Sequence, residues 1–206
     1  MSYDIIGNIA IMKFDERSER LSINSKREFA KGILKMHPNI TSVLEKIERV
    51  KGRLRTIKTR HLAGAKTLEA EYRENGCAFR FNIEKCYFSP RLAEERKKLM
   101  KLCRKGEKIL VMFGGVAPYT IVIAKNIRDI GRVVSIEVGK ECNKYAKWNV
   151  NKNKVADRVE LMQGDVKKVV PKMKKRGEKF DRIIMARPNI QETFLKWALM
   201  AAKKGT

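Results

Sequence analysis

Residues 107–137 form the stretch that most constrains what this chain can fold into. A short apolar run at Lys108–Met112 is followed by the glycine-containing loop Phe113–Pro118 and by the apolar segment Thr120–Asn126. A second apolar run, Arg132–Ile136, comes after a glycine. A strand, a glycine loop, a helix and a second strand in this order predict two parallel strands joined by a helix, which is the unit of a doubly wound α/β sheet.

The loop and the end of the second strand carry residues suited to a nucleotide-type cofactor. Gly114 and Gly115 permit left-handed backbone and close approach of a ligand, and Pro118 suits the first turn of a helix. Glu137 ends the second strand, where a carboxylate can accept hydrogen bonds from ribose hydroxyls. An ordinary crossover with a glycine turn is the simpler alternative, and the lack of a following Lys-Ser/Thr excludes a P-loop. The predicted cofactor residues are Phe113, Gly114, Gly115, Val116 and Glu137.

The pattern of alternating strands and helices continues to residue 206. We predict helices at 140–150, 166–175 and 190–204 and strands at 159–162 and 180–186. Asp165 follows the first of these strands, so it shares the sheet edge at which the glycine loop and Glu137 lie. Two interpretations of Asp165 stay open, a ligand contact and the N-cap of the next helix.

Residues 1–88 are predicted to form a small α+β module, and residues 89–206 the larger α/β domain. The Asn75-Gly76 dipeptide is a strong hairpin signal, and it lies between two alternating runs. The other predicted elements of the module are an opening strand over 3–14, a helix over 26–36 capped by Ser25, a helix over 41–50, and a strand over 53–62 with one cationic face.

The charge of the chain indicates a polyanionic partner. The sequence has 47 Lys and Arg against 23 Asp and Glu, a net charge of +24. Because these basic residues are spread over a chain of ordinary apolar content, nucleic acid is the first candidate, and a basic surface without a partner is the alternative. Absence of an apolar run of about 18 residues predicts no membrane partner. The four cysteines lack CxxC spacing, which makes a zinc site improbable and indicates a reducing, cytoplasmic compartment.

The four predicted strands end in Gly114-Gly115, Glu137, Asp165 and Arg187-Pro188. These strand ends resemble those of Rossmann-like S-adenosylmethionine-dependent methyltransferases. The resemblance implies S-adenosyl-L-methionine as cofactor, with Glu137 at the ribose and Asp165 at the adenine amine. The Arg187-Pro188 loop after the fourth strand would face the substrate. The expected fold class is therefore an α/β, Rossmann-like methyltransferase sheet preceded in the sequence by a small α+β RNA-binding module.

A longer pattern narrows the resemblance to one family. YFSPRLAEER at 87–96 and MFGGVAPYTI at 112–121 resemble the archaeal and eukaryotic tRNA guanine-N1 methyltransferases, which act at tRNA position 37. LRTIKTRHLAG at 54–64 and GNIAIM at 7–12 resemble their tRNA-contacting domain. The wybutosine-pathway aminocarboxypropyl transferase shares this frame, and a non-catalytic tRNA-binding relative is a third hypothesis. A dinucleotide-dependent oxidoreductase is disfavoured by YFSPRLAEER and by the basic charge.

The family resemblance implies roles for individual residues. Glu95 would be the general base that removes the N1 proton of guanine, Arg55 would stabilise the charge that develops on O6, and Tyr87 would pack at the target base. Each could instead be structural: Glu95 a surface helix residue, Arg55 a phosphate contact and Tyr87 a core residue. The remaining substrate-binding residues implied by the resemblance are Arg53, Lys58, Arg60, Arg187 and Pro188.

The chain also departs from the family pattern. Val111 stands where an acid is common, Ala117 where a glycine is usual, and Ala186 where an asparagine helps to place the base. These three residues motivate the non-catalytic hypothesis. The family's separate N-terminal domain and its last strands have no counterpart here, so we expect a shortened chain or a fragment, and a monomer.

Overall fold

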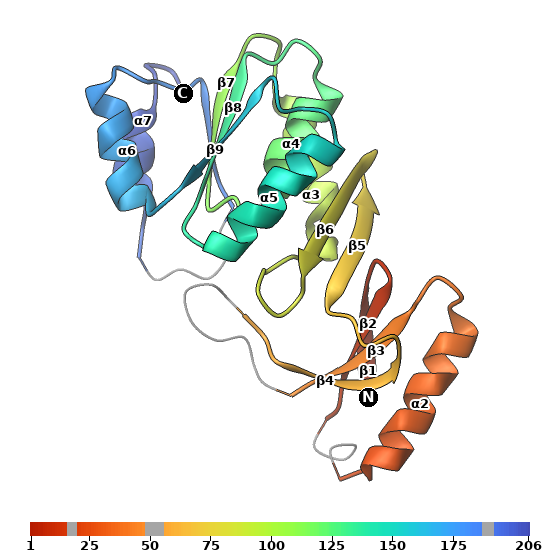
Figure 1. Cartoon of the computed structure of the whole chain (residues 1–206). Helices are drawn as coiled ribbons and strands as arrows, with labels where there is room; N and C mark the ends of the chain where they lie inside the picture. The colour runs from red at the N-terminus through yellow and green to blue at the C-terminus, as the bar shows by residue number, and fades with distance from the viewer. Residues whose placement is uncertain (16–19, 48–55, 187–191) are drawn as a thin grey trace. The chain divides into compact units, whose positions relative to one another are not determined.

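The chain forms two compact units in a computed structural model, which describes residues 1–15, 20–47, 56–186 and 192–206 (Figure 1). The first unit comprises residues 1–73 and 79–90, and the second comprises residues 74–78 and 91–206. The division passes through one hairpin, whose tip belongs to the second unit. Each unit has its own hydrophobic core, and each is described in turn.

The first unit is a four-stranded sheet with one long helix. Its strands lie in the order β1 (Ser2–Ile6), β2 (Ile9–Lys13), β3 (Ser42–Lys46) and β4 (Thr59–Gly64), and only the pair β2–β3 is parallel. Helix α2 (Ile23–Met36) lies beside β3 and β4 (Figure 1). The core that it closes contains Ala10, Met12, Ala30, Ile33, Ile40, Val43, Leu62 and Ala63.

The segment 3–14, predicted as one strand, is a hairpin of β1 and β2. Gly7 has a φ of 59° in the turn, which is the left-handed region that glycine adopts without strain. A Cβ at Gly7 would lie 1.9 Å from the carbonyl oxygen of Glu71, so the turn also needs the missing side chain for close backbone approach. The prediction was wrong because the interruption at Gly7-Asn8 is a two-residue turn that reverses the chain.

The helix predicted over 41–50 was wrong where it is described, because residues 42–46 form strand β3, and residues 48–50 lie outside the described residues. Ser42 to Glu45 are all buried, because β3 lies between β2 and β4 and is covered on both faces. Val43 and Leu44 therefore point to opposite faces, although their spacing from Ile47 also suits a helix. Tertiary burial decided the structure of a short apolar run that periodicity could not assign.

Three smaller corrections concern the ends of elements. Helix α2 is capped by Ser22, whose hydroxyl accepts from the backbone N–H of Ser25, and not by Ser25 itself. Strand β4 begins at Thr59, and residues 53–55 of the predicted strand lie outside the described residues. Strand β10 (Arg182–Met185) and helix α7 (Leu195–Ala201) are shorter than predicted.

The Asn75-Gly76 hairpin is confirmed. Strands β5 (Glu69–Glu74) and β6 (Cys77–Asn82) form a two-stranded sheet of their own. Asn75 and Gly76 have φ angles of 47° and 73°, as a type I′ turn requires at both central residues. Phe88 packs on Tyr72 and Phe81 at the base of this hairpin.

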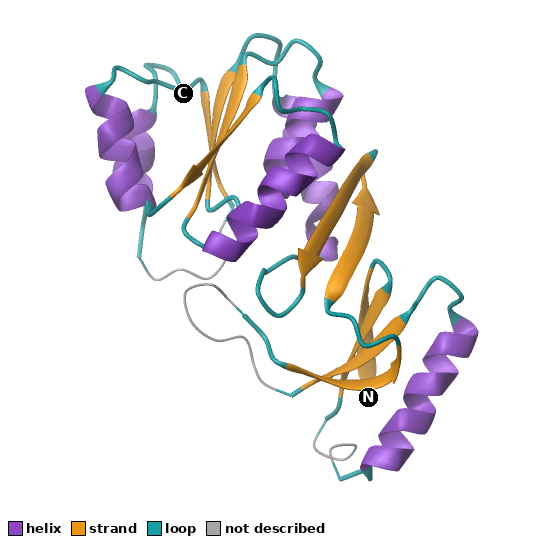
Figure 2. Ribbon diagram, in the orientation of Figure 1, coloured by secondary structure: helices purple, strands orange, loops and turns teal. Residues whose placement is uncertain are grey.

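The second unit contains the doubly wound sheet that the sequence predicts. Its four parallel strands lie in the order β10, β7 (Lys108–Met112), β8 (Arg132–Glu137) and β9 (Val159–Gln163). Figure 2 shows helices on both faces of these strands. The helices not yet bounded are η1 (Pro90–Leu92), α3 (Ala93–Leu102), α4 (Pro118–Asn126), α5 (Lys140–Lys152) and α6 (Val166–Lys175).

The two central strands of this sheet, β7 and β8, are buried on both faces, as parallel strands between helices usually are, whereas the edge strands β9 and β10 are only partly buried. Leu110, Met112, Val134 and Ile136 pack against α6 and α7, and Figure 1 shows α4 and α5 on the other side of the sheet. Among the described residues, no helix is both long enough and apolar enough to cross a membrane.

Candidate cofactor and catalytic site

The glycine loop after β7 holds three residues in left-handed backbone. Phe113, Gly115 and Ala117 have φ angles of 64°, 57° and 67°. A phenylalanine in this region is strained, and such strain persists mainly where the surrounding structure imposes it, often at functional sites. Phe113 is held by an edge-on contact with Phe194, at 4.8 Å between ring centroids. The loop ends at Pro118, the first residue of α4, as predicted.

Gly114 lets the loop approach the neighbouring strand. Its backbone N–H donates to the carbonyl oxygen of Ile136 at 2.8 Å. A Cβ on Gly114 would lie 2.0 Å from the Oγ of Ser135, so a side chain there would displace either the Ser135 hydroxyl or the loop. The glycine therefore favours close packing of the loop on β8.

Glu137 ties together two loops at the carboxyl edge of the sheet. Its Oε2 accepts from the backbone N–H of Gly115 at 2.8 Å, and its Oε1 accepts from that of Gly139 at 2.7 Å. A carboxylate has about four acceptor positions, so these two bonds leave others for a ligand. The half-buried Glu137 is thus positioned beside the glycine loop.

Asp165 is the N-cap of α6, one of the two interpretations that its position allowed. Its Oδ1 accepts from the backbone N–H of Lys167 at 2.9 Å. It follows β9 directly, beyond Gly164, whose backbone N–H donates to the carbonyl oxygen of Glu137 at 2.9 Å. A helix cap and a ligand contact are compatible in principle, because a carboxylate has about four acceptor positions.

Glu95 is an exposed residue near the start of α3, and it has a specific partner. The hydroxyl of Tyr119, the second residue of α4, donates to Glu95 Oε1 at 2.5 Å. Burial, and then this hydrogen bond to a carboxylate, raise the pKa of Tyr119 well above the ordinary value of a phenol. The tyrosine therefore stays a donor throughout the neutral range.

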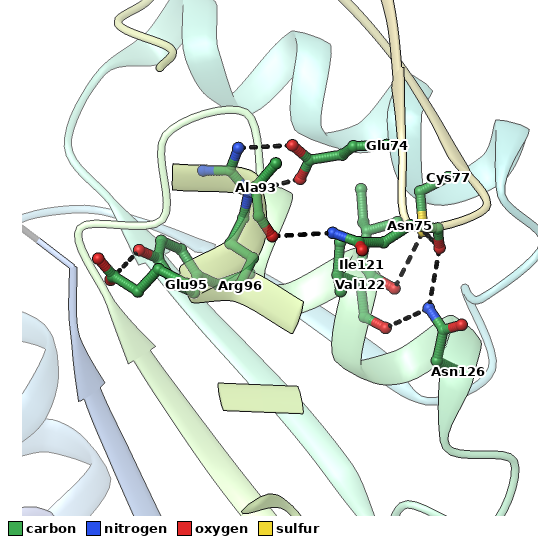
Figure 3. Close-up of polar contacts among 10 residues, drawn as sticks. Glu74, Asn75, Cys77, Ala93, Glu95, Arg96, Ile121, Val122 and Asn126 are labelled. Carbon is green, nitrogen blue, oxygen red and sulfur yellow. Dashed lines mark hydrogen bonds and ion pairs between the residues drawn. The ribbon is translucent and has the colours of Figure 1, made fainter. Parts of the chain in front are cut away.

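Arg96, the neighbour of Glu95, is buried and forms a bidentate ion pair. Its Nε and Nη2 donate to the two carboxylate oxygens of Glu74 at 2.5 and 2.6 Å (Figure 3). Asn75, next to Glu74, donates through Nδ2 to the carbonyl oxygen of Ala93. These contacts hold the hairpin tip against the start of α3 within the second unit. Sequence reasoning missed Arg96, Glu74 and Tyr119, although Arg96 lies within the YFSPRLAEER pattern.

The structure brings some predicted residues together and leaves others apart. The glycine loop, Glu137 and Asp165 share one edge of the second unit, whereas the half-buried Tyr87 belongs to the first unit. Lys58 and Arg60 are exposed in the first unit, and Arg60 Nη1 lies 3.7 Å from Glu45 Oε2. The other predicted residues, Arg53, Arg55, Arg187 and Pro188, lie outside the described residues.

The three departures from the family pattern have different structural settings. Val111 is a fully buried residue of β7. Ala117 is a left-handed residue just before α4, where a glycine would carry no strain. Ala186 follows the last residue of β10 and is half-buried.

The residues at this edge fit a nucleoside-type cofactor. The backbone of the strained glycine loop can approach a ligand closely, and Glu137 and Asp165 can accept hydrogen bonds from its hydroxyl and amine groups. No cluster of His, Cys, Asp or Glu suited to a metal ion occurs within residues 1–15, 20–47, 56–186 and 192–206.

Comparisons with known proteins give the same picture. A family model described as the TRM5/TYW2 methyltransferase domain matches residues 70–206, and one described as the TYW2 N-terminal domain matches residues 1–67. The tRNA (guanine(37)-N(1))-methyltransferase Trm5b of Pyrococcus abyssi is 34% identical over 99% of this chain and 57% of its own length. The tRNA (guanine(37)-N(1))/4-demethylwyosine(37)-methyltransferase Taw22 of Nanoarchaeum equitans is 40% identical over 75% of this chain and 49% of its own.

A solved structure agrees with the fold. The complex of aTrm5 with tRNALeu superposes with a TM-score of 0.84 at 27% identity, covering 98% of this chain and 56% of that one. The chain thus spans about half the length of the relatives it matches.

Proposed function

Because this chain belongs to the TRM5/TYW2 methyltransferase family, we propose that it transfers a methyl group from S-adenosyl-L-methionine to N1 of guanosine 37 in tRNA. The observation that carries the proposal is the glycine loop held by Glu137 at the carboxyl edge of a parallel sheet. The printed activities of the Pyrococcus and Nanoarchaeum relatives support the choice of guanosine 37.

The cofactor would be held by the second unit. The backbone of Phe113 to Val116 would line the cofactor site. Glu137 would accept hydrogen bonds from the ribose hydroxyls, and Asp165 would accept one from the adenine amine. Bound S-adenosyl-L-methionine would supply an electrophilic methyl group on a sulfonium centre. The contribution of the chain is to orient this group and to keep its ribose fixed.

Glu95 would act as the general base. Guanine N1 carries a proton and is a poor nucleophile until that proton leaves, so the carboxylate of Glu95 takes it as the new N1–carbon bond forms. The bond from carbon to sulfur breaks with its electron pair staying on sulfur, which becomes a neutral thioether. Negative charge that develops on O6 would be stabilised by Arg55, and Tyr87 would pack against the target base.

The first unit would bind tRNA. Lys58 and Arg60 are exposed there, and with Arg53 they would contact phosphates; Arg187 and Pro188 would contact the substrate from the second unit. We assign residues 1–88 to tRNA binding and residues 89–206 to methyl transfer. A monomeric protein in the cytoplasm stays our expectation.

Calorimetric titration with S-adenosylhomocysteine tests the cofactor site. We expect saturable binding by the intact chain, and binding at least about 10-fold weaker in Glu137→Ala and Asp165→Ala, because each loses a charge-assisted hydrogen bond. Glu141→Ala removes a half-buried carboxylate on α5 that pairs with Lys144, and as the matched control it should bind normally. A folded chain that binds tRNA but not S-adenosylhomocysteine would support the non-catalytic hypothesis instead.

A second candidate is aminocarboxypropyl transfer, which the match of residues 1–67 to the TYW2 N-terminal domain favours. The two reactions break different bonds at the same sulfur. Methyl transfer leaves S-adenosylhomocysteine, whereas aminocarboxypropyl transfer leaves methylthioadenosine. Chromatography of the spent cofactor after incubation with tRNA distinguishes them, and we expect S-adenosylhomocysteine.

A further inference from the structure

Glu95 and the glycine loop are connected through one side chain, that of Tyr119. Tyr119 is 6% exposed and follows Pro118 directly, so its backbone is fixed by the first turn of α4 at the end of the glycine loop. Its hydroxyl reaches across to α3 and donates to Glu95 Oε1 at 2.5 Å. The side chain of Tyr119 thus links the proposed base to the end of the proposed cofactor loop within the second unit.

The ring of Tyr119 lies against a buried charge. The guanidinium carbon of Arg96 is 5.6 Å from the ring centroid, which is within the range of a cation–π contact. Arg96 itself is 2% exposed and is fixed by its two hydrogen bonds to Glu74 (Figure 3). Arg96 cannot move without leaving the buried carboxylate of Glu74 without its partner. Arg96 therefore stays in position and supports the ring of Tyr119.

The hydrogen bond has a direction that matters for proton transfer. Burial keeps Tyr119 protonated, and the charged groups that act on it are Glu95 and Arg96 on α3 and Glu74 on β5. The hydroxyl of Tyr119 donates its hydrogen bond to Oε1 of Glu95. Among the described residues, Tyr119 is the group that hydrogen-bonds to this carboxylate, so Oε2 is left to accept another proton.

We propose that Tyr119 is a positioning residue for the Glu95 general base, holding Oε1 so that Oε2 receives the N1 proton of guanine. This inference rests on the proposed role of Glu95. A tyrosine that served packing alone would not need its hydroxyl group.

Tyr119→Phe tests the inference, because it removes the hydroxyl and keeps the ring. We expect kcat for methyl transfer to fall about 10- to 100-fold, since a loosely held base is misplaced, while KM for tRNA and affinity for S-adenosylhomocysteine stay unchanged. Tyr145→Phe on α5 removes the same atom elsewhere in the second unit and should leave kcat unchanged.

An unchanged kcat, or a fall in kcat accompanied by an equal rise in KM for tRNA, would overturn the positioning role. The carbon-13 NMR shift of the Glu95 carboxyl group gives a readout that needs no activity. This shift should differ between Tyr119→Phe and the intact chain because the hydrogen bond is lost, and equal shifts would contradict the inference. If the intact chain transfers no methyl group, the proposed function fails, whereas the NMR comparison still decides whether Tyr119 acts on Glu95.

Discussion

In the part of the chain that the structure describes, each unit contains a buried ion pair, and the two pairs are arranged in opposite ways. In the first unit, Lys26 Nζ lies 2.7 Å from Glu45 Oε1, and the buried Glu45 lies beneath the exposed guanidinium of Arg60. In the second unit, the buried Arg96 lies beneath Tyr119, which holds the exposed carboxylate of Glu95.

In each unit, a buried charged side chain helps to position an exposed side chain of opposite charge. A buried acid orients an exposed cation in the first unit, which suits contact with phosphates. A buried cation supports an exposed acid in the second unit, which suits acceptance of a proton. The pairs also differ in completeness, because Arg96 satisfies both oxygens of Glu74, whereas Glu45 Oε2 has no hydrogen-bond partner in the described part of the chain.

The largest effect is expected where the exposed acid is neutralised. Glu95→Gln should lower the rate of methyl transfer about 10²- to 10⁴-fold, because the amide cannot accept the N1 proton. Affinities for tRNA and for S-adenosylhomocysteine should not change. Single-turnover transfer of labelled methyl groups measures the rate, and Glu94→Gln, the exposed neighbour on α3, is the matched control. Equal activity of the two variants would remove Glu95 from the chemistry.

The buried pair of the second unit should matter next. Arg96→Met leaves Glu74 charged and buried without its partner, so the second unit should lose about 3–5 kcal/mol of stability. Glu74→Met together with Arg96→Met should cost less than Arg96→Met alone, since no unpaired charge remains. Hydrogen exchange followed by mass spectrometry resolves the two units separately. The comparison fails if Lys26→Met destabilises residues 91–206 as much as Arg96→Met does.

The exposed cationic residues of the first unit should affect the affinity for tRNA and not the rate of methyl transfer. Replacing Lys58 and Arg60 by Ala should weaken tRNA binding and flatten the slope of log affinity against log salt by about two units, one for each phosphate contact. Lys172→Ala with Lys175→Ala, on the exposed face of α6, removes the same charge from the second unit. If both double variants flatten the slope equally, overall charge and not a defined face of the first unit binds tRNA.

The smallest effect is expected at Ala117, where the glycine loop is strained. Ala117→Gly should stabilise the second unit by about 1 kcal/mol, because glycine adopts a φ of 67° without a clash. Ala124→Gly in the middle of α4 should destabilise it by a similar amount, since that position is helical. Thermal unfolding measures both, and a destabilising Ala117→Gly would show that the alanine methyl group is needed for packing.

The sequence predicted the second unit better than the first. Strands β7, β8 and β9 were predicted within a residue or two, because each is a short apolar run bounded by a loop and a helix. In the first unit, the turn signal at Gly7 was interpreted as a mere interruption of one strand, and the short apolar run of β3 suits a helix equally well. Glu45 illustrates the difficulty, because a charged residue in a buried strand is understood only once Lys26 is seen beside it.

The candidate site could be predicted where it depends on the ends of strands. Glu137 and the glycine loop were expected at one edge, and Glu137 indeed contacts Gly115. The contact of Tyr119 with Glu95 joins two helices from positions 24 residues apart, and no periodicity reports such a pair. The same holds for Arg96 and Glu74, which come together only through the hairpin turn.

Nucleoside analysis of methylated tRNA tests the central claim most directly. The chain would be incubated with S-adenosyl-L-methionine and a tRNA transcript carrying guanosine at position 37, or the same transcript with adenosine there. Digestion and mass spectrometry should reveal 1-methylguanosine in the first transcript and none in the second. Failure of a folded, S-adenosylhomocysteine-binding chain to form 1-methylguanosine in the first transcript would contradict the account.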